Sequence, residues 1–472
     1  MRLYRQSLAL LTDLYELTMV YGYWKAGLAQ REAVFSLNFR RWPFQGGFAI
    51  AAGLESAVDF LKALQFSQSD LAYLEELDLF ETPFLHFLSQ FSFACDIDAI
   101  PEGSLVFPYE PLIRVKGPLW QAQLLESPLL NILNFQTLIA TKSARICMAA
   151  RPDPVVEFGM RRAQGIDGAI SASRAAFIGG CESTSDVIAG KLFGIPVRGT
   201  HAHSWIMAFD EEQMAFETFA KIMPENCILL IDTYDSLKGA KRAIQAACKL
   251  PHFKLSGVRL DSGDLAQLSI EVRKLLDAAG FPQAHIMASN ELDEYLIRDL
   301  KQQGAKISMW GVGTHLVTGK GQPALDGVYK LAALQNEWGQ WEHKLKLSEQ
   351  TAKVTNPGIL QVRRFFDGQF YVADAIWDEL LGIEEPCTIV AQHDPNQQVV
   401  PQAPHFDVLV PIFRAGKGVY QSPSLVQIRA KAQEELQRLA PEMERLTNPR
   451  WYLAGLERSL YRKKLELIQS FR

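Results

Sequence analysis

The chain has 472 residues, enough for two or three domains of the usual ~100–200 residues each. Apolar residues make up 48 % of it and charged residues 21 %, which excludes a disordered, collagen-like or coiled-coil protein. The formal net charge of -5 gives no broad positive field, so we expect neither a nucleic acid nor a membrane surface as a partner.

The six cysteines include no CxxC pair, and their apolar or small neighbours are typical of buried, reduced thiols. The apolar run at 8–11 is too short for the core of a signal peptide or for a membrane span. The sequence therefore predicts a cytoplasmic protein.

Residues 1–135 are predicted to form a separate α+β domain. A helical pattern covers 12–25, alternating apolar residues at 33–39 indicate a strand, and prolines punctuate 101–118. Arg40 and Arg41 lie among aromatic residues in the motif FRRWPF (39–44), a combination that suits a flat anionic ring. Solvated charges beside a core phenylalanine explain the motif equally well, and Tyr15 could simply pack behind a capped helix start.

The middle of the chain, 136–345, alternates short apolar runs with helical patterns, which indicates βα units. The runs lie at 195–197, 227–231, 255–260, 285–288 and 306–310, and the helical patterns at 236–249, 262–279 and 291–303. Each helical pattern opens with a Ser, Asp or Asn that can cap the first N–H groups. We predict a (β/α) barrel or an open parallel sheet.

The apolar runs end in polar residues or glycine, namely Thr200, Asp232, Asp261, Asn290 and Gly311. Parallel strands all end at one edge of a sheet, and in such folds that edge carries the site. These five residues should therefore converge on one mouth.

Two histidines, His201 and His203, follow the first run in the motif GTHAHSW (199–205). An imidazole there could act as base, nucleophile or metal ligand, and the spacing alone does not choose. The structural alternative is one core or capping histidine and one exposed histidine. Zinc is weakly supported, because no cysteine lies nearby.

The motif VRLDSGD (258–264) places Arg259 and Asp261 at a turn between a strand and a helix. Asp261, with Asp232 as a second carboxylate, can hold Mg²⁺ or ribose hydroxyls while Arg259 neutralises an anionic oxygen. Helix capping by Ser262 or Asp264 is the structural alternative.

Two further motifs could contact an anionic ligand. Gly311, Gly313 and Thr314 in WGVGT (310–314) let backbone N–H groups approach a phosphate, a use that we favour over a mere turn. Phe158 and Arg161 in EFGMRR (157–162) again pair an aromatic ring with a cation.

Residues 346–472 are predicted to form a small accessory region. Strands are expected around 365–372 and at 387–391, followed by a Gln/Pro-rich loop at 392–404 and a charged helix at 423–446.

Taken together, the motifs resemble the nicotinate phosphoribosyltransferase family over almost the whole chain. The matching stretches are LLTDLYELTM (10–19), FRRWPFQGGFAIAAGLE (39–55), EFGMRRAQGIDGAISASR (157–174), AGKLFGIPVRGTHAHSWIMAF (189–209), IDTYDS (231–236), GVRLDSGDL (257–265), WGVGTHLVT (310–318), DGVYKLA (326–332) and RLTNPRWY (445–452). The resemblance implies an α/β fold: an irregular (β/α) barrel of the type II phosphoribosyltransferase kind, an α+β N-terminal domain and a C-terminal accessory region packing on that domain. It also implies a homodimer with shared active sites.

The implied reaction joins nicotinate to phosphoribosyl diphosphate, giving nicotinate mononucleotide and diphosphate. ATP hydrolysis would be coupled to it, with Mg²⁺ as cofactor, in NAD salvage. By motif, His203 would be the histidine that ATP phosphorylates, and Asp232 and Asp261 would serve catalysis and hold Mg²⁺.

The resemblance also implies the residues that bind the substrates. Tyr15 from the second copy and Phe158 would enclose the pyridine ring, while Arg161, Thr200 and Arg259 would face its carboxylate. The phosphoribosyl diphosphate would be held by Arg40, Arg41, Gly311, Gly313 and Thr314.

Two positions depart from the family pattern. Asp186 stands where an Asn is expected, and a carboxylate near the ring would favour nicotinamide over nicotinate. Asp326 replaces the first residue of a Gly-Gly pair, with no consequence that the sequence reveals. The alternatives are therefore a nicotinamide phosphoribosyltransferase, a catalytically silent barrel that acts as a binding protein and, more weakly, a Schiff-base aldolase using Lys330.

Overall fold

The computed structural model describes residues 7–250, 255–350, 353–392, 394 and 396–471. The chain divides into two compact units. We call Met1–Thr141 together with Ala324–Arg472 the terminal unit, because it holds both ends of the chain, and Lys142–Pro323 the central unit. Each is described by itself.

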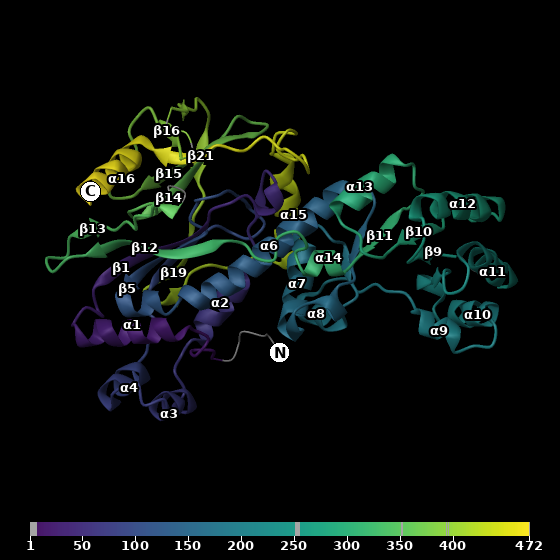
Figure 1. Cartoon of the computed structure of the whole chain (residues 1–472), viewed down its shortest axis with the longest axis horizontal. Helices are drawn as coiled ribbons and strands as arrows, with labels where there is room; N and C mark the ends of the chain where they lie inside the picture. The colour runs from purple at the N-terminus through teal and green to yellow at the C-terminus, as the bar shows by residue number, and fades with distance from the viewer. Residues whose placement is uncertain (1–6, 251–254, 351–352, 393, 395, 472) are drawn as a thin grey trace. The chain divides into compact units, whose positions relative to one another are not determined.

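The main sheet of the terminal unit has seven strands, all joined by antiparallel pairing. In sheet order they are β13 (Trp341–His343), β12 (Gly327–Gln335), β1 (Glu32–Phe39), β5 (Ile113–Pro118), β3 (Asp96–Ala99), β19 (Val410–Arg414) and β20 (Lys417–Gly418). Strands from both ends of the chain thus share one sheet (Figure 1).

Strand β1 confirms the strand expected at 33–39, but it is buried on both faces. Phe35, Leu37 and Phe39 join the large core of the unit, whereas Val34 packs with Ala333 on the other side. The expected in-out alternation is therefore wrong, since a strand in the middle of a sheet covered on both faces is apolar almost throughout.

A second sheet of six strands is built mostly from the C-terminal region. Its order is β17 (Gln398–Val399), β16 (Ile389–Ala391), β21 (Ala454–Glu457), β15 (Tyr371–Asp378), β14 (Leu360–Phe366) and β18 (His405–Asp407). The strands expected around 365–372 are the two arms of the β14–β15 hairpin, and its turn lies between them. A short pair, β2 (Ala49–Ile50) with β4 (Leu105–Val106), completes the strands of this unit that the structure describes.

The helices of the terminal unit are α1 (Leu14–Lys25), α2 (Leu54–Ala63), α3 (Gln68–Glu76), α4 (Thr82–Ser89), α5 (Leu119–Gln123), α15 (Leu425–Gln437) and α16 (Arg458–Ser470), with the 3₁₀ turn η1 (Pro43–Gln45). Helix α6 (Glu126–Ala150) leads from this unit into the next. The helix expected at 423–446 ends early, at Gln437, because Pro441 cannot continue it.

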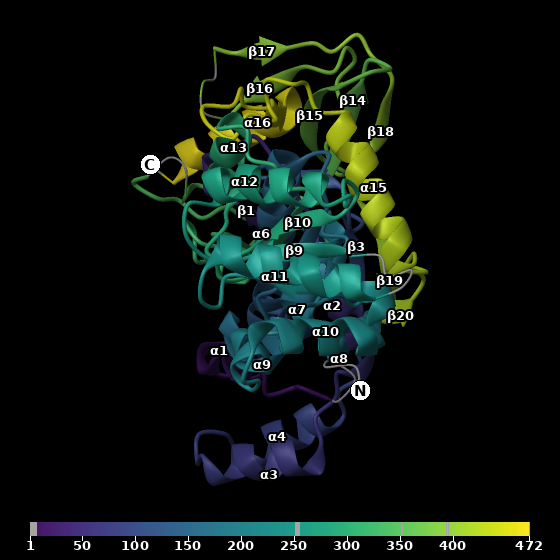
Figure 2. The same cartoon turned by 90° about the vertical axis from the view of Figure 1, so that its right-hand side faces the viewer.

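The central unit contains a six-stranded sheet in which every neighbouring pair is parallel. Its order is β7 (Ser183–Thr184), β6 (Val155–Glu157), β11 (Met309–Val312), β10 (His285–Ala288), β9 (Gly257–Leu260) and β8 (Ile228–Leu230). In Figure 2, α11 (Ser236–Lys249) and α12 (Leu265–Ala278) lie in front of β9 and β10 and cover that face. Within the described residues no pairing joins β7 to β8, so this parallel α/β sheet is open rather than closed.

The strand expected at 195–197 is wrong. Val197 forms only an isolated parallel bridge to Thr184, because Pro196 has no N–H group to donate to a ladder. The short strands β6 and β7 occupy this side of the sheet instead. The other helices of the unit are α7 (Gly165–Gly179), α8 (Val187–Phe193), α9 (His203–Met207), α10 (Glu212–Ile222), α13 (Glu294–Gln302) and α14 (Thr314–Val317), with the 3₁₀ turns η2 (Met160–Arg162) and η3 (Pro224–Asn226).

The expected helices after β8, β9 and β10 are confirmed, with later starts for two of them. The N-caps are Asp235, Asp264 and Asp293, whose carboxylates accept hydrogen bonds from N–H groups of the first turn. Because α12 and α13 begin only after Asp264 and Asp293, several residues between each strand and its helix stay free to face the mouth of the sheet.

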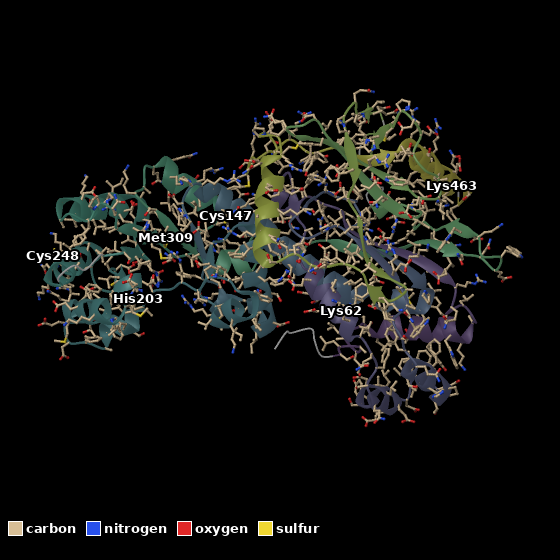
Figure 3. All side chains as sticks on the ribbon, turned by 180° about the vertical axis from the view of Figure 1, so that it is seen from behind. Lys62, Cys147, His203, Cys248, Met309 and Lys463 are labelled. Atoms are coloured by element: carbon tan, nitrogen blue, oxygen red, sulfur yellow. The ribbon has the colours of Figure 1, made fainter. Side chains whose placement is uncertain are left out.

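All six cysteines are free, as expected, and four of them are buried. Cys147 is half-buried and Cys248 is exposed, which corrects the expectation of uniform burial (Figure 3). Among the described residues, the structure contains no helix with both the length and the apolar character that crossing a bilayer requires.

Candidate active site

Arg259, the next-to-last residue of β9, is the centre of the polar cluster at the carboxyl edge of the central sheet. Its Nε donates to Ser289 Oγ at 2.8 Å, its Nη1 to Thr200 Oγ1 at 2.7 Å and its Nη2 to Asp261 Oδ1 at 2.9 Å. Asp261 and Ser289 follow the neighbouring strands β9 and β10, and Thr200 lies in the loop before α9. The expected convergence of Thr200 and Asp261 is confirmed. The guanidinium also lies 5.7 Å from the centroid of the Phe158 ring.

The carboxylates of Asp261 and Asp232 are linked through the backbone. Asp232 Oδ2 accepts hydrogen bonds from the Asp261 N–H at 2.8 Å and from Ser262 Oγ at 2.6 Å. Its other oxygen, Oδ1, is buried and has no hydrogen-bond partner among the described residues. Burial alone would raise the pKa of Asp261, but hydrogen bonds from Ser289 and Arg259 and the charge of Arg259 outweigh burial and lower it. Asp261 is therefore a persistent anion.

The two histidines have different environments, as the structural alternative anticipated. His201 is buried; its Nε2 accepts a hydrogen bond from the Leu230 N–H at 3.1 Å, and burial lowers its pKa to about 4. His203 begins α9 and is half-exposed, with Nδ1 3.2 Å from Thr233 Oγ1 and Nε2 3.9 Å from Asp261 Oδ2. His201 thus ties its loop to edge strand β8, whereas His203 is accessible; Figure 3 shows it in the central unit.

The turn after β11 packs directly against Phe158. A Cβ atom on Gly311 would come within 2.8 Å of the Phe158 ring, so only glycine fits there. The Phe158 N–H also donates to Val312 O at 2.8 Å. The beginning of α14, with Gly313 as N-cap and Thr314 as first residue, is therefore held beside the Phe158 ring, with its first N–H groups at the carboxyl edge of the sheet.

Glu157, which was not predicted as a site residue, holds the neighbouring turn at Phe158 and Gly159 through hydrogen bonds. Its Oε2 accepts hydrogen bonds from Thr184 Oγ1 at 2.6 Å and Ser173 Oγ at 2.8 Å, and its Oε1 accepts from the Gly159 N–H. Burial raises its pKa despite these bonds. By fixing Gly159, Glu157 fixes the turn that begins with Phe158 and leads into η2.

Arg161, in η2, is exposed, and the structure records no hydrogen bond or ion pair for it among the described residues. Asn290 was expected at the mouth, but it is exposed, with a left-handed backbone (φ 91°), and its neighbour Ser289 makes the contacts. No site role was predicted for Ser289 or Thr233 from the sequence. Ser289 directly follows β10, and Thr233 lies in the loop after β8.

Tyr15, Arg40 and Arg41 belong to the terminal unit. Tyr15 lies on α1 and is 45 % exposed; burial and the nearby Glu126 carboxylate raise its pKa to about 12. Arg40 and Arg41 follow the last residue of β1, and Arg41 Nε donates to Asp326 Oδ2 at 2.7 Å.

Two other predicted positions have structural roles. Asp186 is buried and caps α8, accepting from the Ile188 and Ala189 N–H groups with Oδ1, while its Oδ2 has no partner among the described residues. Lys330 lies on the antiparallel strand β12 and pairs with Glu126 at 3.2 Å. This is not the strand-end position that a Schiff-base aldolase needs.

An accessible histidine, an arginine beside an aromatic ring and two neighbouring carboxylates at the carboxyl edge of a parallel sheet are features of an α/β enzyme that handles anionic substrates. Groups of three or more His, Cys, Asp or Glu side chains arranged to hold a metal by themselves are absent from the described ranges. A cation at this edge would therefore share its coordination with ligand oxygens.

Family profiles match the chain along nearly its full length. The N-terminal domain of nicotinate phosphoribosyltransferase matches residues 10–134, the nicotinate phosphoribosyltransferase family matches 154–338, and the C-terminal domain matches 360–464. The chain belongs to the nicotinate phosphoribosyltransferase family.

Similar proteins agree with this assignment. The chain is 40 % identical over 471 residues to a nicotinate phosphoribosyltransferase of Bacillus subtilis, covering 98 % of this chain and 95 % of the relative. It is 35 % identical over 529 residues to that of Homo sapiens, covering 96 % and 95 %. The crystal structure of human nicotinic acid phosphoribosyltransferase superposes with a TM-score of 0.82 at 32 % identity, covering 97 % of this chain and 100 % of that chain.

A nicotinate-nucleotide pyrophosphorylase structure from Pyrococcus furiosus, at 24 % identity, 91 % and 95 % coverage and a TM-score of 0.71, shares the fold. These matches confirm the recognition, the type II phosphoribosyltransferase fold class, the enzyme class and the function in NAD salvage that the motifs predicted.

Proposed function

We propose that the protein forms nicotinate mononucleotide and diphosphate from nicotinate and phosphoribosyl diphosphate, with coupled ATP hydrolysis and Mg²⁺. In this reaction a bond forms between the pyridine nitrogen and C1′ of the ribose, and the bond from C1′ to the diphosphate oxygen breaks. The environment of Arg259 is the main support for this proposal. Three hydrogen-bond partners hold its guanidinium beside the Phe158 ring, and one of them, Asp261, also lies next to His203.

The guanidinium of Arg259 supports recognition of an aromatic acid. It has five N–H donors, of which Ser289, Thr200 and Asp261 take three. Within the part of the chain that the structure describes, one N–H on each terminal nitrogen remains, and a carboxylate could accept this pair in bidentate fashion. Phe158 would stack on the pyridine ring, and Thr200 and the exposed Arg161 would add to the carboxylate site. Charge-assisted contacts contribute about 1.5–3 kcal/mol each, more than the ~0.5–1.5 kcal/mol of ring stacking, so the acid should be preferred over the amide.

Gly311, Gly313 and Thr314 would bind the 5′-phosphate through backbone N–H groups, and Arg40 and Arg41 would bind the diphosphate. The carboxylates fit Mg²⁺, because Asp232 offers a buried oxygen that has no hydrogen-bond partner among the described residues and Asp261 stays ionised. When bound there, Mg²⁺ would supply positive charge to the departing diphosphate. Asp232 and Asp261 would hold it together with substrate oxygens, while Arg259 keeps Asp261 in place.

His203 would be phosphorylated by ATP. Its imidazole is accessible, Thr233 orients Nδ1, and the Asp261 carboxylate near Nε2 stabilises a positively charged ring during transfer. A phosphoryl group there would add negative charge beside the ribosyl donor until hydrolysis removes it.

The enzyme would work in the cytoplasm as a homodimer with shared sites. Leu14, Tyr15 and Met19, successive along one side of α1, are all exposed, as a helix face that contacts a second copy would be. Tyr15 would then complete the partner's nicotinate site. In this proposal residues 1–135 would supply Arg40, Arg41 and the dimer contact of α1, residues 136–345 would form the catalytic domain, and residues 346–472 would be an accessory region that packs on the N-terminal domain.

Purified protein should release diphosphate from nicotinate and phosphoribosyl diphosphate, faster with ATP and Mg²⁺ than without. Labelled ATP should give an acid-labile phosphohistidine, and His203→Ala should abolish both the label and the stimulation by ATP while leaving slow uncoupled transfer.

His86→Ala is the matched control, since His86 is exposed on α4 of the terminal unit. Absence of diphosphate release would favour a silent binding protein, and faster release with nicotinamide would favour an amide enzyme. Equal stimulation by ATP in wild type and His203→Ala would remove His203 from its role.

A further inference from the structure

Asp326 lies at the end of the ladder that joins β12 to β1. The next residue, Gly327, pairs with Phe39, the last residue of β1. Asp326 therefore lies opposite the segment that follows β1, which contains Arg40 and Arg41. A Cβ on Gly327 would come within 2.0 Å of the Asn134 side chain on α6, so a larger residue there would require that side chain to shift. The glycine sets the close approach, and the aspartate provides the side chain beside the arginines.

The Asp326 carboxylate contacts both arginine residues. Its Oδ1 lies 3.4 Å from the Arg40 N–H and 3.3 Å from the Arg41 N–H, and its Oδ2 accepts from Arg41 Nε at 2.7 Å. The Arg41 side chain is 80 % exposed, that of Asp326 only 25 %. The Asp326 carboxylate is thus half-buried, and the Arg41 side chain extends from it into solvent.

The same segment is held on its other side by the C-terminal motif RLTNPRWY. Trp42 stacks on Trp451, with ring centroids 6.5 Å apart and an angle of 17° between the rings. Contacts with Asp326 and with Trp451 therefore hold the segment that carries the two arginines, although the Arg41 side chain itself is exposed.

We propose that Asp326 is a positioning residue for phosphoribosyl diphosphate: it holds Arg41 by the Nε edge and leaves the terminal nitrogens Nη1 and Nη2 facing outward for phosphate oxygens. This inference rests on the proposed role of Arg41 in diphosphate binding. A free arginine loses much rotamer freedom when it binds, and an anchored one has lost part of it already.

The carboxylate also offsets part of the charge on Arg41. That effect is small, because an exposed pair is screened by water and salt, whereas a diphosphate brings several negative charges and binds two nitrogens at once. Orientation therefore outweighs neutralisation, and loss of Asp326 weakens donor binding.

The test measures KM for both substrates in Asp326→Gly, Asp326→Asn, Arg41→Ala and the double variant Arg41→Ala/Asp326→Gly. Asp326→Gly should raise KM for phosphoribosyl diphosphate roughly three- to tenfold, with kcat and KM for nicotinate within about twofold of wild type. Asp326→Asn should fall between, since its amide oxygen still accepts from the backbone. With Arg41 already alanine, Asp326→Gly should add almost nothing.

Glu337→Ala is the matched control, because it removes another exposed ion pair of the same unit, Arg31–Glu337 at 3.2 Å, and should leave every KM unchanged. An unchanged or lower KM for phosphoribosyl diphosphate in Asp326→Gly overturns the inference, as does an additive effect in the double variant. If Arg41→Ala itself leaves that KM unchanged, the proposed role of Arg41 fails instead.

Discussion

The protein uses arginine–carboxylate clusters in two regions with opposite solvent access. In the terminal unit, Arg364 on β14 is fully buried and donates to both oxygens of Asp374, with Nη2 2.6 Å from Oδ2. Glu110 and Glu435 lie 3.8 and 3.5 Å from the same guanidinium. Phe107 and Tyr371 cover it at 5.2 and 4.8 Å.

In the central unit, Arg259 has similar neighbours but keeps an open side. Its three partners are Ser289, Thr200 and Asp261, and Asp261 remains part-exposed. The comparison shows that the ion pair itself does not mark a functional site. The two clusters differ in solvent access: the cluster at Arg259 lies at a partly exposed edge of its sheet, whereas the enclosed cluster at Arg364 joins elements of the core.

The largest expected effect comes from breaking the enclosed cluster. Arg364→Met would leave the buried carboxylate of Asp374 without its cation, which should lower the free energy of unfolding by about 3–5 kcal/mol. Urea denaturation measures it. The neighbouring Arg363 pairs with Asp407 nearer the surface, so Arg363→Met should cost only ~0–1 kcal/mol. Equal losses of unfolding free energy in the two variants would show that burial of an ion pair does not determine its contribution to stability.

A smaller effect on free energy, but a direct one on catalysis, is expected at the open cluster. Arg259→Lys cannot reproduce three donors in one plane, so kcat/KM for nicotinate should fall about 10- to 100-fold, equivalent to ~1.5–3 kcal/mol. The midpoint of thermal unfolding should move little. Arg298→Lys, at an exposed ion pair with Asp299, serves as control. If Arg259→Lys were unfolded as well as inactive, the Arg259 cluster would have a structural role like that of the Arg364 cluster, contrary to the comparison above.

The smallest effect concerns pH. Burial, then the charge and hydrogen bond of Asp374, raise the pKa of Glu110, so the folded protein keeps a proton that the unfolded chain loses near pH ~4.3. Its contribution is therefore complete below that pH and declines as the pH rises toward the folded-state pKa. Glu110→Gln should match wild type at low pH and equal or exceed it in stability at neutral pH. A variant less stable than wild type at every pH would show that Glu110 is ionised in the cluster.

Much of the central unit follows from local pattern. The apolar runs and capping aspartates predict β8, β9 and β10 with their helices, and strand direction then brings Asp232 and Asp261 together. Thr200 reaches them from a loop, because the strand expected before it does not form. Ser289 escapes prediction because its role depends on Arg259 reaching across from the neighbouring strand. The role of Asp326 escapes for a similar reason, since Arg41 lies 285 residues away in the chain.

The N-terminal region is harder to predict for a physical reason. Strand β1 is buried on both faces because sequence-distant segments cover it, so its alternating pattern gives the wrong exposure. Pro196 shows the reverse: a local property prevents a strand that the apolar run alone suggests.

The strand order of the main sheet in the terminal unit determines when each strand can pair during synthesis of the chain. Strands β1, β3 and β5 emerge from the ribosome early, but their neighbours β12 and β19 come only after the entire central unit. The edge strand β1 lacks its final partner until Gln335 has been made, and the edge strand β3 lacks its partner until Arg414 has been made. Because the central unit contains its own parallel sheet, we expect that it can fold while the terminal unit still lacks β12 and β19.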